Sequence, residues 1–369
     1  MNILVLNWRD PKNPNSGGAE IVTMEHAKGW VKAGHKVTWL TSSFKNSKNK
    51  EIIDEVEFLR RGNSYTVYLI APIYYLISRN KFDIVIDEIH GIPFFTPLYA
   101  RKPKIAFLHE VAGEIWHFMF PFPLNYLGIL SERIYLWLYK SMPFWVDAES
   151  TVEELVSYGI KRENITAIPC PINNPVVSKV PQKEKVPTFI FISRLVKMKG
   201  IENAMKAFAL ILNEMPQAVL WIVGTGETHY VNKLRKLAKD LSIYRQIIFY
   251  GHVSNEEKLE LMGRSHLLLH ASVKEGWGLV VLEAASQGTP SVVYNVSGLR
   301  DIINKYKTGV ILDKNTPDQL AKELIKLYSD KRHYRKLQSN GLKNVGKLKW
   351  NDSTKQSIDL LNKTIRLNN

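Results

Sequence analysis

Two glutamates, Glu275 and Glu283, lie in the segment EGWGLVVLEAASQGTPSVV near the C-terminal end of the chain. The small residues after Glu275 predict a loop, and Leu279 to Ser286 predict the first turns of a buried helix that Gly288-Thr289-Pro290 ends. Glu275 would then precede the helix, and Glu283 would lie about two turns inside it. The amino end of a helix offers unpaired N–H groups and a positive dipole, which suit a diphosphate. A diphosphate with hydroxyl groups for two carboxylates is the chemistry of a nucleotide sugar.

Strand and helix patterns alternate along both halves of the chain, and this alternation positions the two glutamates. It predicts an α/β protein with doubly wound parallel sheets, in which ligands bind at the carboxyl ends of the strands. The segment 171–187 is rich in proline and polar residues and predicts a linker. The predicted strands are 3–7, 36–42, 83–88, 104–110, 145–150, 188–193, 218–226, 246–251, 266–271 and 291–295. The predicted helices are 20–33, 131–140, 201–215, 230–241, 279–286 and the charged region 317–345.

The segment from Glu275 resembles the donor-binding signature of the retaining glycosyltransferases of family four, the glycosyl transferases group 1. That signature has seven residues between two glutamates, Gly-aromatic-Gly after the first and a Gly-Thr-Pro close. Three further segments follow the family's order, namely NILVLNWRDPKNPNSGGAE at the start, FLHEVAGEIWHFMFPFPLNYLG from Phe107 and FISRLVKMKG from Phe191. The resemblance covers nearly the whole chain and implies the GT-B fold, in which two Rossmann-like doubly wound domains face a cleft.

The resemblance also implies how the chain divides. We expect an acceptor-binding domain at 1–172 and a nucleotide-sugar-binding domain at 187–349. A final helix at 350–369 would return to the first domain. Closure of the domains about the segment 171–187 would assemble the site.

By the same resemblance, Arg194 and Lys199 clamp the donor phosphates, since fixed cations stabilise a departing diphosphate. Glu275 would bind sugar hydroxyls and orient the anomeric carbon, and Glu283 would accept hydrogen bonds from the ribose. The alternatives are surface cations in a basic domain, a helix-dipole role for Glu275 and a nearby lysine partner for Glu283. The further residues expected to bind the donor through their backbones are Gly17, Gly18, Gly224, Gly251, Gly276, Trp277, Gly278 and Leu279.

His109 ends a predicted strand, and the resemblance places it near the transferred sugar. It therefore joins Glu275, Arg194 and Lys199 as an expected catalytic residue, with a structural histidine as the alternative. His266 and His270 are four residues apart, a spacing that could bind a metal on a helix, but their apolar strand pattern predicts core or loop positions.

The formal net charge of +15 is uneven along the chain. Residues 1–180 hold 20 Lys and Arg against 18 Asp and Glu, and residues 181–369 hold 30 against 17, which gives +2 and +13. The excess lies in the predicted donor-binding half, where it suits a diphosphate or an anionic lipid surface. A solvated lysine-rich surface is the plain alternative. No nucleic-acid-binding module is recognisable.

The single cysteine, Cys170, fits a reducing compartment, and no signal peptide or membrane-spanning run is recognisable. We therefore expect a cytoplasmic protein. The aromatic segment from Ile115 to Trp145 gives a further hypothesis, contact with a lipid-linked acceptor or a membrane surface. Its alternative is a buried core and interdomain hinge.

Together these patterns predict a metal-independent hexosyltransferase without a bound cofactor, whose donor substrate is a nucleoside diphosphate sugar. The family needs no metal, and the chain has no Asp-x-Asp motif. The expected acceptor is a glycan or a lipid-linked molecule, on the cytoplasmic face of a membrane if the aromatic segment touches one. The alternatives are a GT-B epimerase, an inverting transferase, and a sugar-nucleotide or anionic-lipid binding protein without catalysis.

Overall fold

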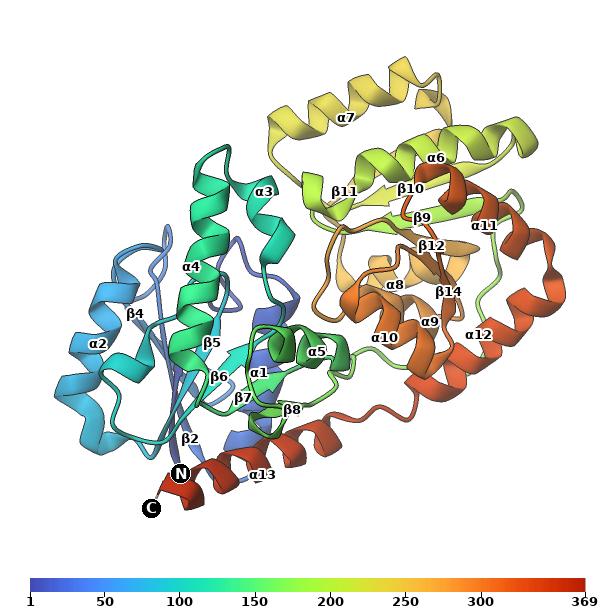
Figure 1. Ribbon diagram of the computed structural model, residues 1–369. Helices are drawn as coiled ribbons and strands as arrows, with labels where there is room; N and C mark the ends of the chain where they lie inside the picture. Colours follow the sequence, from blue (N-terminus) through green and yellow to red (C-terminus); the bar gives the residue numbers. More distant parts are fainter. Residues whose placement is uncertain (369) are drawn as a thin grey trace. The chain divides into compact units, whose positions relative to one another are not determined.

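A computed structural model describes residues 1–368 as two compact units (Figure 1). The first unit holds residues 1–170 and the end of the chain from Lys349, and the second holds Pro171–Leu348. The helix α13 (Trp350–Asn368) therefore belongs to the first unit, where it packs along α1 (Gly18–Lys32).

The described part of the first unit forms an eight-stranded sheet in the order β3-β4-β2-β1-β5-β6-β7-β8. All its strand pairs are parallel except β3 with β4. The strands are β1 (Asn2–Leu6), β2 (Lys36–Thr41), β3 (Lys50–Ile53), β4 (Val56–Arg60), β5 (Ile84–Ile89), β6 (Lys104–Leu108), β7 (Phe144–Val146) and β8 (Ile165–Ala167). The remaining helices are α2 (Val67–Ser78), α3 (Trp116–Met119), α4 (Leu124–Tyr139) and α5 (Glu149–Ser157).

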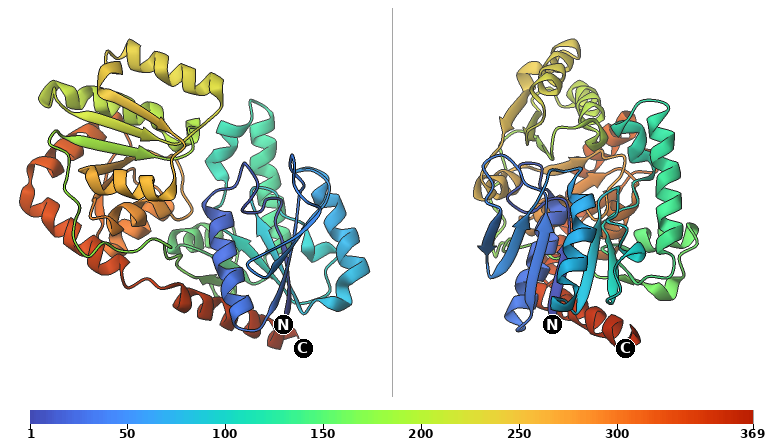
Figure 2. Two further views of the ribbon diagram at one scale, coloured as in Figure 1. Left: turned by 180° about the vertical axis from the view of Figure 1, so that it is seen from behind. Right: turned by 90° about the vertical axis from the view of Figure 1, so that its left-hand side faces the viewer.

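Helices cover both faces of this sheet. The crossover through α1 runs from β1 to β2, in one direction along the sheet, while those through α2 and α4 run in the other direction. Because such crossovers are right-handed, α2 and α4 lie on the face opposite α1 (Figure 2). On the α1 face, the buried rings of Trp30 and Trp145 lie 6.1 Å apart, and α13 adds Trp350 next to His26.

The described part of the second unit forms a six-stranded parallel sheet in the order β11-β10-β9-β12-β13-β14. Its strands are β9 (Thr188–Ile192), β10 (Val219–Val223), β11 (Ile247–Gly251), β12 (Leu267–His270), β13 (Ser291–Val293) and β14 (Gly309–Ile311). Its helices are α6 (Ile201–Glu214), α7 (Thr228–Asp240), α8 (Asn255–Arg264), α9 (Leu279–Ser286), α10 (Ser297–Tyr306), α11 (Pro317–Ser329) and α12 (Lys331–Val345).

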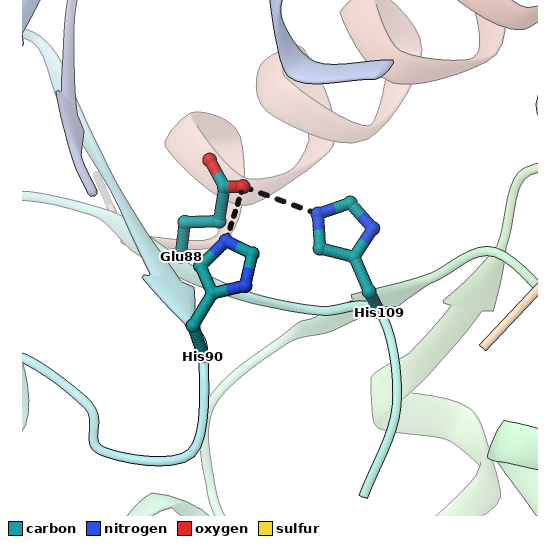
Figure 3. Close-up of side chains that lie close together, drawn as sticks. All are labelled: Glu88, His90 and His109. Carbon is teal, nitrogen blue, oxygen red and sulfur yellow. Dashed lines mark hydrogen bonds and ion pairs between the residues drawn. The ribbon is translucent and has the colours of Figure 1, made fainter. Parts of the chain in front are cut away.

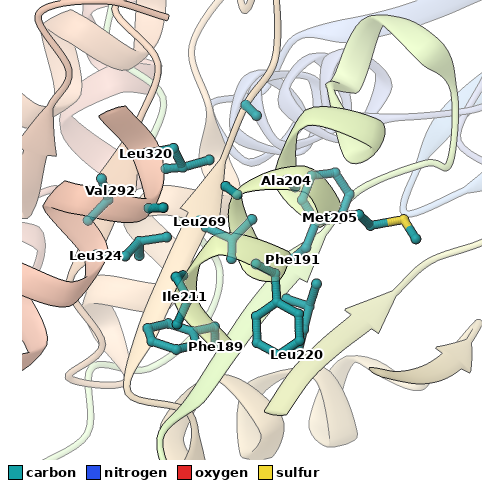
Figure 4. Packing of buried hydrophobic residues seen from close by; sticks show 14 of the residues in the cluster. Phe189, Phe191, Ala204, Met205, Ile211, Leu220, Leu269, Val292, Leu320 and Leu324 are labelled. Carbon is teal, nitrogen blue, oxygen red and sulfur yellow. The ribbon is translucent and has the colours of Figure 1, made fainter. Parts of the chain in front are cut away.

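The core of the second unit lies between the sheet and the helices α6 and α11 (Figure 4). Phe189, Phe191, Leu220 and Leu269 come from the strands and are at most 1% exposed. Helices cover both faces of a parallel sheet, so each strand is a continuous run of apolar residues and does not alternate between apolar and polar residues. The core therefore fixes the carboxyl ends of the strands, where the polar loops begin.

The structure differs from three of the expectations. The predicted strand 145–150 ends at Val146, and Glu149 begins α5. The segment 171–187 is not a free linker, since it belongs to the second unit and bonds to it, for example from the Val177 amide to the Ser286 carbonyl at 3.0 Å. Several elements were not predicted, namely the short strands β3, β4, β8 and β14 and the helices α2, α3, α5, α8 and α10.

Candidate functional site

The predicted donor-binding residues of the second unit follow the carboxyl ends of its strands. Arg194 lies two residues after β9, Gly224 directly follows β10 and Gly251 ends β11. Glu275 lies in the loop between β12 and α9. Because parallel strands end at one edge of a sheet, these residues gather along that edge.

Lys199 and Glu275 form the central ion pair of this edge. The Lys199 Nζ lies 2.6 Å from the Glu275 Oε1, and both side chains are mostly buried, with 15% and 13% exposed. The same oxygen accepts a hydrogen bond from the Ser272 hydroxyl at 2.8 Å, and the His270 Nε2 lies 3.4 Å away. The structure therefore brings together two of the predicted catalytic residues and adds two partners that were not predicted.

The charges around Glu275 keep it ionised. Burial alone would raise the pKa of its carboxyl group, but the neighbouring Lys199 charge and the hydrogen bonds lower it. Burial lowers the pKa of His270 to about 4, so this histidine is neutral at pH 7. The His270 Nδ1 accepts from the Ser272 amide at 3.4 Å, which leaves the Nε2 proton directed at Glu275.

Glu283 lies in the fifth position of α9, about one turn inside the helix rather than the two that we expected. Its Oε1 accepts from Lys258 at 2.8 Å and from the Asn174 amide at 3.2 Å. The lysine partner given as the alternative in the sequence analysis is therefore present. It does not exclude a ligand, because the Glu283 side chain keeps 17% of its surface exposed.

The helix α9 begins as the sequence predicts, at Leu279 after the Gly276-Trp277-Gly278 loop. Gly278 caps the helix with φ of +102°, where a side chain would also meet Leu299 at 2.6 Å, so glycine is required. The Trp277 side chain is 6% exposed, and its ring lies 6.4 Å from that of Tyr306. Its buried ring leaves the backbone of this loop, rather than the indole, to meet a ligand.

The loops after β9, β10 and β11 meet through backbone contacts. The Gly224 amide donates to the Gly251 carbonyl at 2.8 Å, and a Cβ on Gly224 would lie 1.9 Å from the Ser193 carbonyl oxygen. This close approach explains why glycine occupies position 224. Arg194 is exposed, and among residues 1–368 it forms no ion pair. Its cation is therefore placed beside the loops without a carboxylate partner.

Gly17, Gly18 and His109 lie in the first unit, apart in the chain from the residues above. Gly17 precedes α1, and its amide donates to the Glu20 Oε2 at 2.6 Å. Its φ of −147° suits any residue, so its backbone conformation does not require glycine. Glu20 is fully buried and also lies 3.0 Å from the Arg9 Nη2.

His109 lies in a chain of ionisable side chains along the carboxyl edge of the first sheet. Its Nδ1 is 2.6 Å from the Asp147 Oδ2 and its Nε2 is 3.1 Å from the Glu88 Oε1. The His90 Nε2 approaches the same Glu88 oxygen at 2.9 Å, so both rings point at one atom (Figure 3). His90 in turn lies 3.4 Å from Glu20. The chain crosses the ends of β5, β6 and β7, which are neighbours in the sheet.

The two carboxylates hold His109 protonated. Burial alone would lower the pKa of His109, but the charges and hydrogen bonds of Asp147 and Glu88 raise it to about 10. Burial would raise the pKa of Glu88, but its two histidine partners lower it to about 2. Both ring nitrogens of His109 therefore donate protons, and the imidazolium has no lone pair with which to act as a base.

Glu88, His90 and His109 are also the group of described residues whose ligand atoms lie close enough for a metal ion, all within 4.8 Å of one another. Arg9 argues against a metal here. Its Nη2 lies 3.4 Å from the His90 Nδ1 and can only donate, which favours a lone pair on that nitrogen and a proton on Nε2, 2.9 Å from Glu88. A metal on Nε2 would have to displace this proton, so the geometry favours a hydrogen-bonded chain.

Five of these residues were not predicted as site residues, namely Glu88, His90, Asp147, His270 and Ser272. Each lies at the end of a strand or within two residues of it. A search of every predicted strand end for ionisable residues would have found Glu88, His90 and His270, but not Asp147, which lies three residues before the end of the predicted strand 145–150. Their pairing could not have been predicted, because it depends on the strand order.

Matches to two described families cover nearly the whole chain. Residues 16–174 match "Glycosyltransferase Family 4", and residues 175–344 match "Glycosyl transferases group 1". The chain belongs to the family 4 glycosyltransferases of group 1. It is therefore a glycosyltransferase, as the sequence predicted.

Relatives from three named organisms differ in how much of the chain they match. The N-acetyl-alpha-D-glucosaminyl L-malate synthase of Bacillus anthracis is 25% identical over 343 residues, which cover 88% of each chain. The poly(glycerol-phosphate) alpha-glucosyltransferase of Bacillus subtilis is 30% identical over 172 residues, 46% of this chain but 24% of its own length. An uncharacterised glycosyltransferase of Methanocaldococcus jannaschii, 31% identical, is covered over 43% of its length.

Solved structures confirm the predicted GT-B class. Sucrose-phosphate synthase from Thermosynechococcus elongatus superposes with a TM-score of 0.80 over 100% of both chains, at 15% identity. HepE of Anabaena, solved with UDP-glucose, gives 0.77 at 17% identity, over 98% of this chain and 100% of its own. At these identities the likeness concerns the fold alone.

Proposed function

We propose that this family 4 enzyme transfers a hexose or related sugar from a nucleoside diphosphate to an acceptor hydroxyl, with retention of the anomeric configuration. The observation that carries the proposal is the Lys199–Glu275 ion pair beside the amino end of α9. A cation, free helix N–H groups and a carboxylate at one sheet edge are the groups that a sugar diphosphate needs.

Binding of the donor would divide this ion pair between two parts of the ligand. The diphosphate attracts Lys199 and exposed Arg194, while the first N–H groups of α9 bind phosphate oxygens. Glu275, released from its lysine, accepts hydrogen bonds from sugar hydroxyls. Glu283 does the same for the ribose when Lys258 turns away. Each lysine already neutralises its carboxylate before the donor arrives, so no buried charge is left unpaired.

The proposed step exchanges one bond at the anomeric carbon on a single face of the sugar. The bond from this carbon to the phosphate oxygen breaks as the bond to the acceptor oxygen forms. The acceptor proton passes to the departing phosphate, because His109 is protonated and cannot accept it. The protein supplies positioning and positive charge rather than a covalent intermediate. We expect this step to need no metal ion and no cofactor.

We propose only the chemical class of the acceptor, which is a glycan or a lipid-linked molecule. The relatives' names include a glucosyltransferase on poly(glycerol-phosphate), a synthase on malate and a mannosyltransferase on phosphatidylinositol monomannoside. They differ in both sugar and acceptor, so the family does not select one. A cytoplasmic location, with peripheral contact to a membrane, remains our prediction.

A thermal-shift panel tests the donor site first. UDP, GDP, ADP and their common sugar conjugates are added without metal and again with EDTA, since a ligand of the native state raises the midpoint by mass action. We expect one base class to stand out, with the same shift in EDTA. No shift with any nucleotide would contradict the donor site.

The stereochemistry of the product tests the proposed reaction. The anomeric configuration of the first product, read by NMR, separates retention from inversion. An epimerised donor without transfer would indicate the epimerase. Donor binding without turnover would indicate a binding protein.

A further inference from the structure

The helix α2 of the first unit presents a broad apolar face to solvent. It carries no charged residue, and Leu69, Ile73 and Ile77 are 72%, 60% and 83% exposed. Its other face is buried, with Val67, Ala71 and Tyr75 in the core. A helix that is apolar on both faces belongs in a core or against a partner, and the outer face of α2 has no covering element among residues 1–368.

This face continues across the loop after β5 to α4. The loop packs on α2, since the Tyr75 hydroxyl accepts from the Arg101 amide at 3.0 Å, and on α4, since the Tyr139 hydroxyl accepts from the Thr96 amide at 3.1 Å. Both helices lie on the same side of the sheet (Figure 2). Within the loop, Leu98 is 69% exposed. Exposed apolar side chains therefore occur on α2, on this loop and on α4, and we call these three segments together the α2–α4 face.

The α4 end of this face is aromatic and rigidly held. Trp137 is 64% exposed and Phe122 is 79% exposed, and the neighbouring exposed apolar residues are Phe118, Met119, Phe120, Leu124, Tyr126, Leu127, Leu130 and Ile134. The buried Glu132 carboxylate fixes their backbone, because it accepts from the Ala112 and Gly113 amides, both at 2.7 Å. The buried core given as the alternative in the sequence analysis is therefore present for part of this segment, since Tyr135, Tyr139 and Trp145 are core residues.

The exposed charged residues in the part of the chain that holds the α2–α4 face, residues 61–143, are mostly positive. Between Arg61 and Pro143 the exposed cations number six and the exposed carboxylates two, Asp83 and Glu114. The Asp83 carboxylate already accepts from the Asn2 amide at 2.7 Å. The six cations are Arg61, Arg79, Lys81, Arg101, Arg133 and Lys140. Lys140 lies over the ring of Trp137, at 5.1 Å from its centroid.

We propose that the α2–α4 face docks the first unit on the surface of an anionic lipid bilayer. Exposed leucine, isoleucine and aromatic side chains enter the interfacial region, while the flanking arginines and lysines meet lipid phosphates. A second copy of the chain would bring six cations against six, which opposes self-association through this face. No helix in residues 1–368 is long and apolar enough to cross a bilayer. The inference rests on the peripheral membrane contact named under the proposed function and assigns it to a surface, and it holds for any acceptor.

Vesicle flotation tests the proposal on the full chain. The probes are vesicles of phosphatidylcholine alone and of phosphatidylcholine with one third phosphatidylglycerol, each at about 0.05 M and about 0.5 M salt. We expect flotation with the anionic vesicles at low salt, and less at high salt because salt screens the lysines and arginines. Leu69→Gln should weaken this binding about tenfold, because a leucine side chain gains free energy when the bilayer removes it from water and a glutamine side chain does not.

A matched control separates the face from general stickiness. Leu367 lies on α13, packed on the opposite side of the sheet, and is 72% exposed, the same fraction as Leu69. Leu367→Gln should bind vesicles as the unchanged protein does. Three results would overturn the proposal: no flotation of the unchanged protein, equal losses in both variants, or a concentration-dependent dimer that Leu69→Gln dissociates. Nucleotide thermal shifts in both variants should match the unchanged protein, so failure here is distinct from failure of the donor site.

Discussion

The carboxyl edges of the two sheets carry ionisable groups in opposite arrangements. In the first unit, Glu88 and Asp147 are 0% and 3% exposed, and the protonated His109 joins them. In the second unit, Glu275 and Glu283 each pair with one lysine and keep 13% and 17% of their side chains exposed. Buried ion pairs fix geometry because breaking them is costly, whereas partly exposed pairs can exchange partners at little cost. The first edge is built to hold one charge state, and the second to release its lysines to a ligand.

The same carboxylate-to-amide change should separate the two edges. Asp147→Asn removes the nearer of the two counterions of buried His109 and should cost about 3 kcal/mol or more of unfolding free energy. Glu275→Gln should cost less, about 1–2 kcal/mol, because Lys199 keeps 15% of its side chain exposed and can turn toward water. Urea unfolding measures the loss, and hydrogen exchange localises it to β6 and β7 or to the α9 region. Similar losses in both variants would remove the distinction.

Variants of the second edge should lose the most activity, although they lose the least stability. Lys199→Ala and Glu275→Ala should each lower transfer by about 10²–10³-fold or more while leaving the fold intact, because each removes a group that stabilises the departing charge or positions the sugar. Turnover with the donor found by the thermal-shift panel, together with far-UV circular dichroism, measures both. Lys206→Ala, an exposed lysine of α6, is the control and should keep full activity. Unchanged turnover in either site variant would contradict the assignment.

The sequence predicted the second edge much better than the first. The Glu275 segment carries a local signature, and α9 begins and ends at the predicted residues. The group Glu88, His90, His109 and Asp147 carries none, because its members come from three strands and lie up to 59 residues apart in the sequence. Their contacts follow from the strand order β5-β6-β7, which periodicity alone does not give. The exposed face of α2 was missed for the opposite reason, since an apolar run normally predicts burial.

Two glycine-to-alanine variants test whether the backbone of each edge requires a glycine. Gly224→Ala should cost about 1–3 kcal/mol, because φ is +127° and the new Cβ would meet the Ser193 carbonyl. Gly17→Ala should change stability by about 0.5 kcal/mol or less, since φ is −147° and the nearest atom to a Cβ is 3.9 Å away. Urea midpoints of the two variants check this. A large loss at Gly17 would show that the first edge also depends on close backbone contact.

The stability contributions of His109 in the first edge and His270 in the second should depend on pH in opposite directions. The folded pKa of His109, about 10, lies above its unfolded value, so its stabilising contribution is complete below about pH 6.5 and is lost as pH rises toward 10. The folded pKa of His270, about 4, lies below that value, so its contribution is present above about pH 6.5 and is lost as pH falls through 4. Either group changes stability by at most about 1.4 kcal/mol per pH unit.

Imidazole NMR across pH 4–10 measures these two histidines directly. At pH 8 the His109 ring should still be protonated, and at pH 5 the His270 ring should still be neutral. Asp147→Asn should lower the pKa of His109 and leave the pKa of His270 unchanged, because the two histidines belong to different sheets. An ordinary titration of His109 near pH 6.5 would mean that the carboxylates do not hold its proton. His109 would then be free to act as a base, and the acceptor proton in the proposed step would have a second destination.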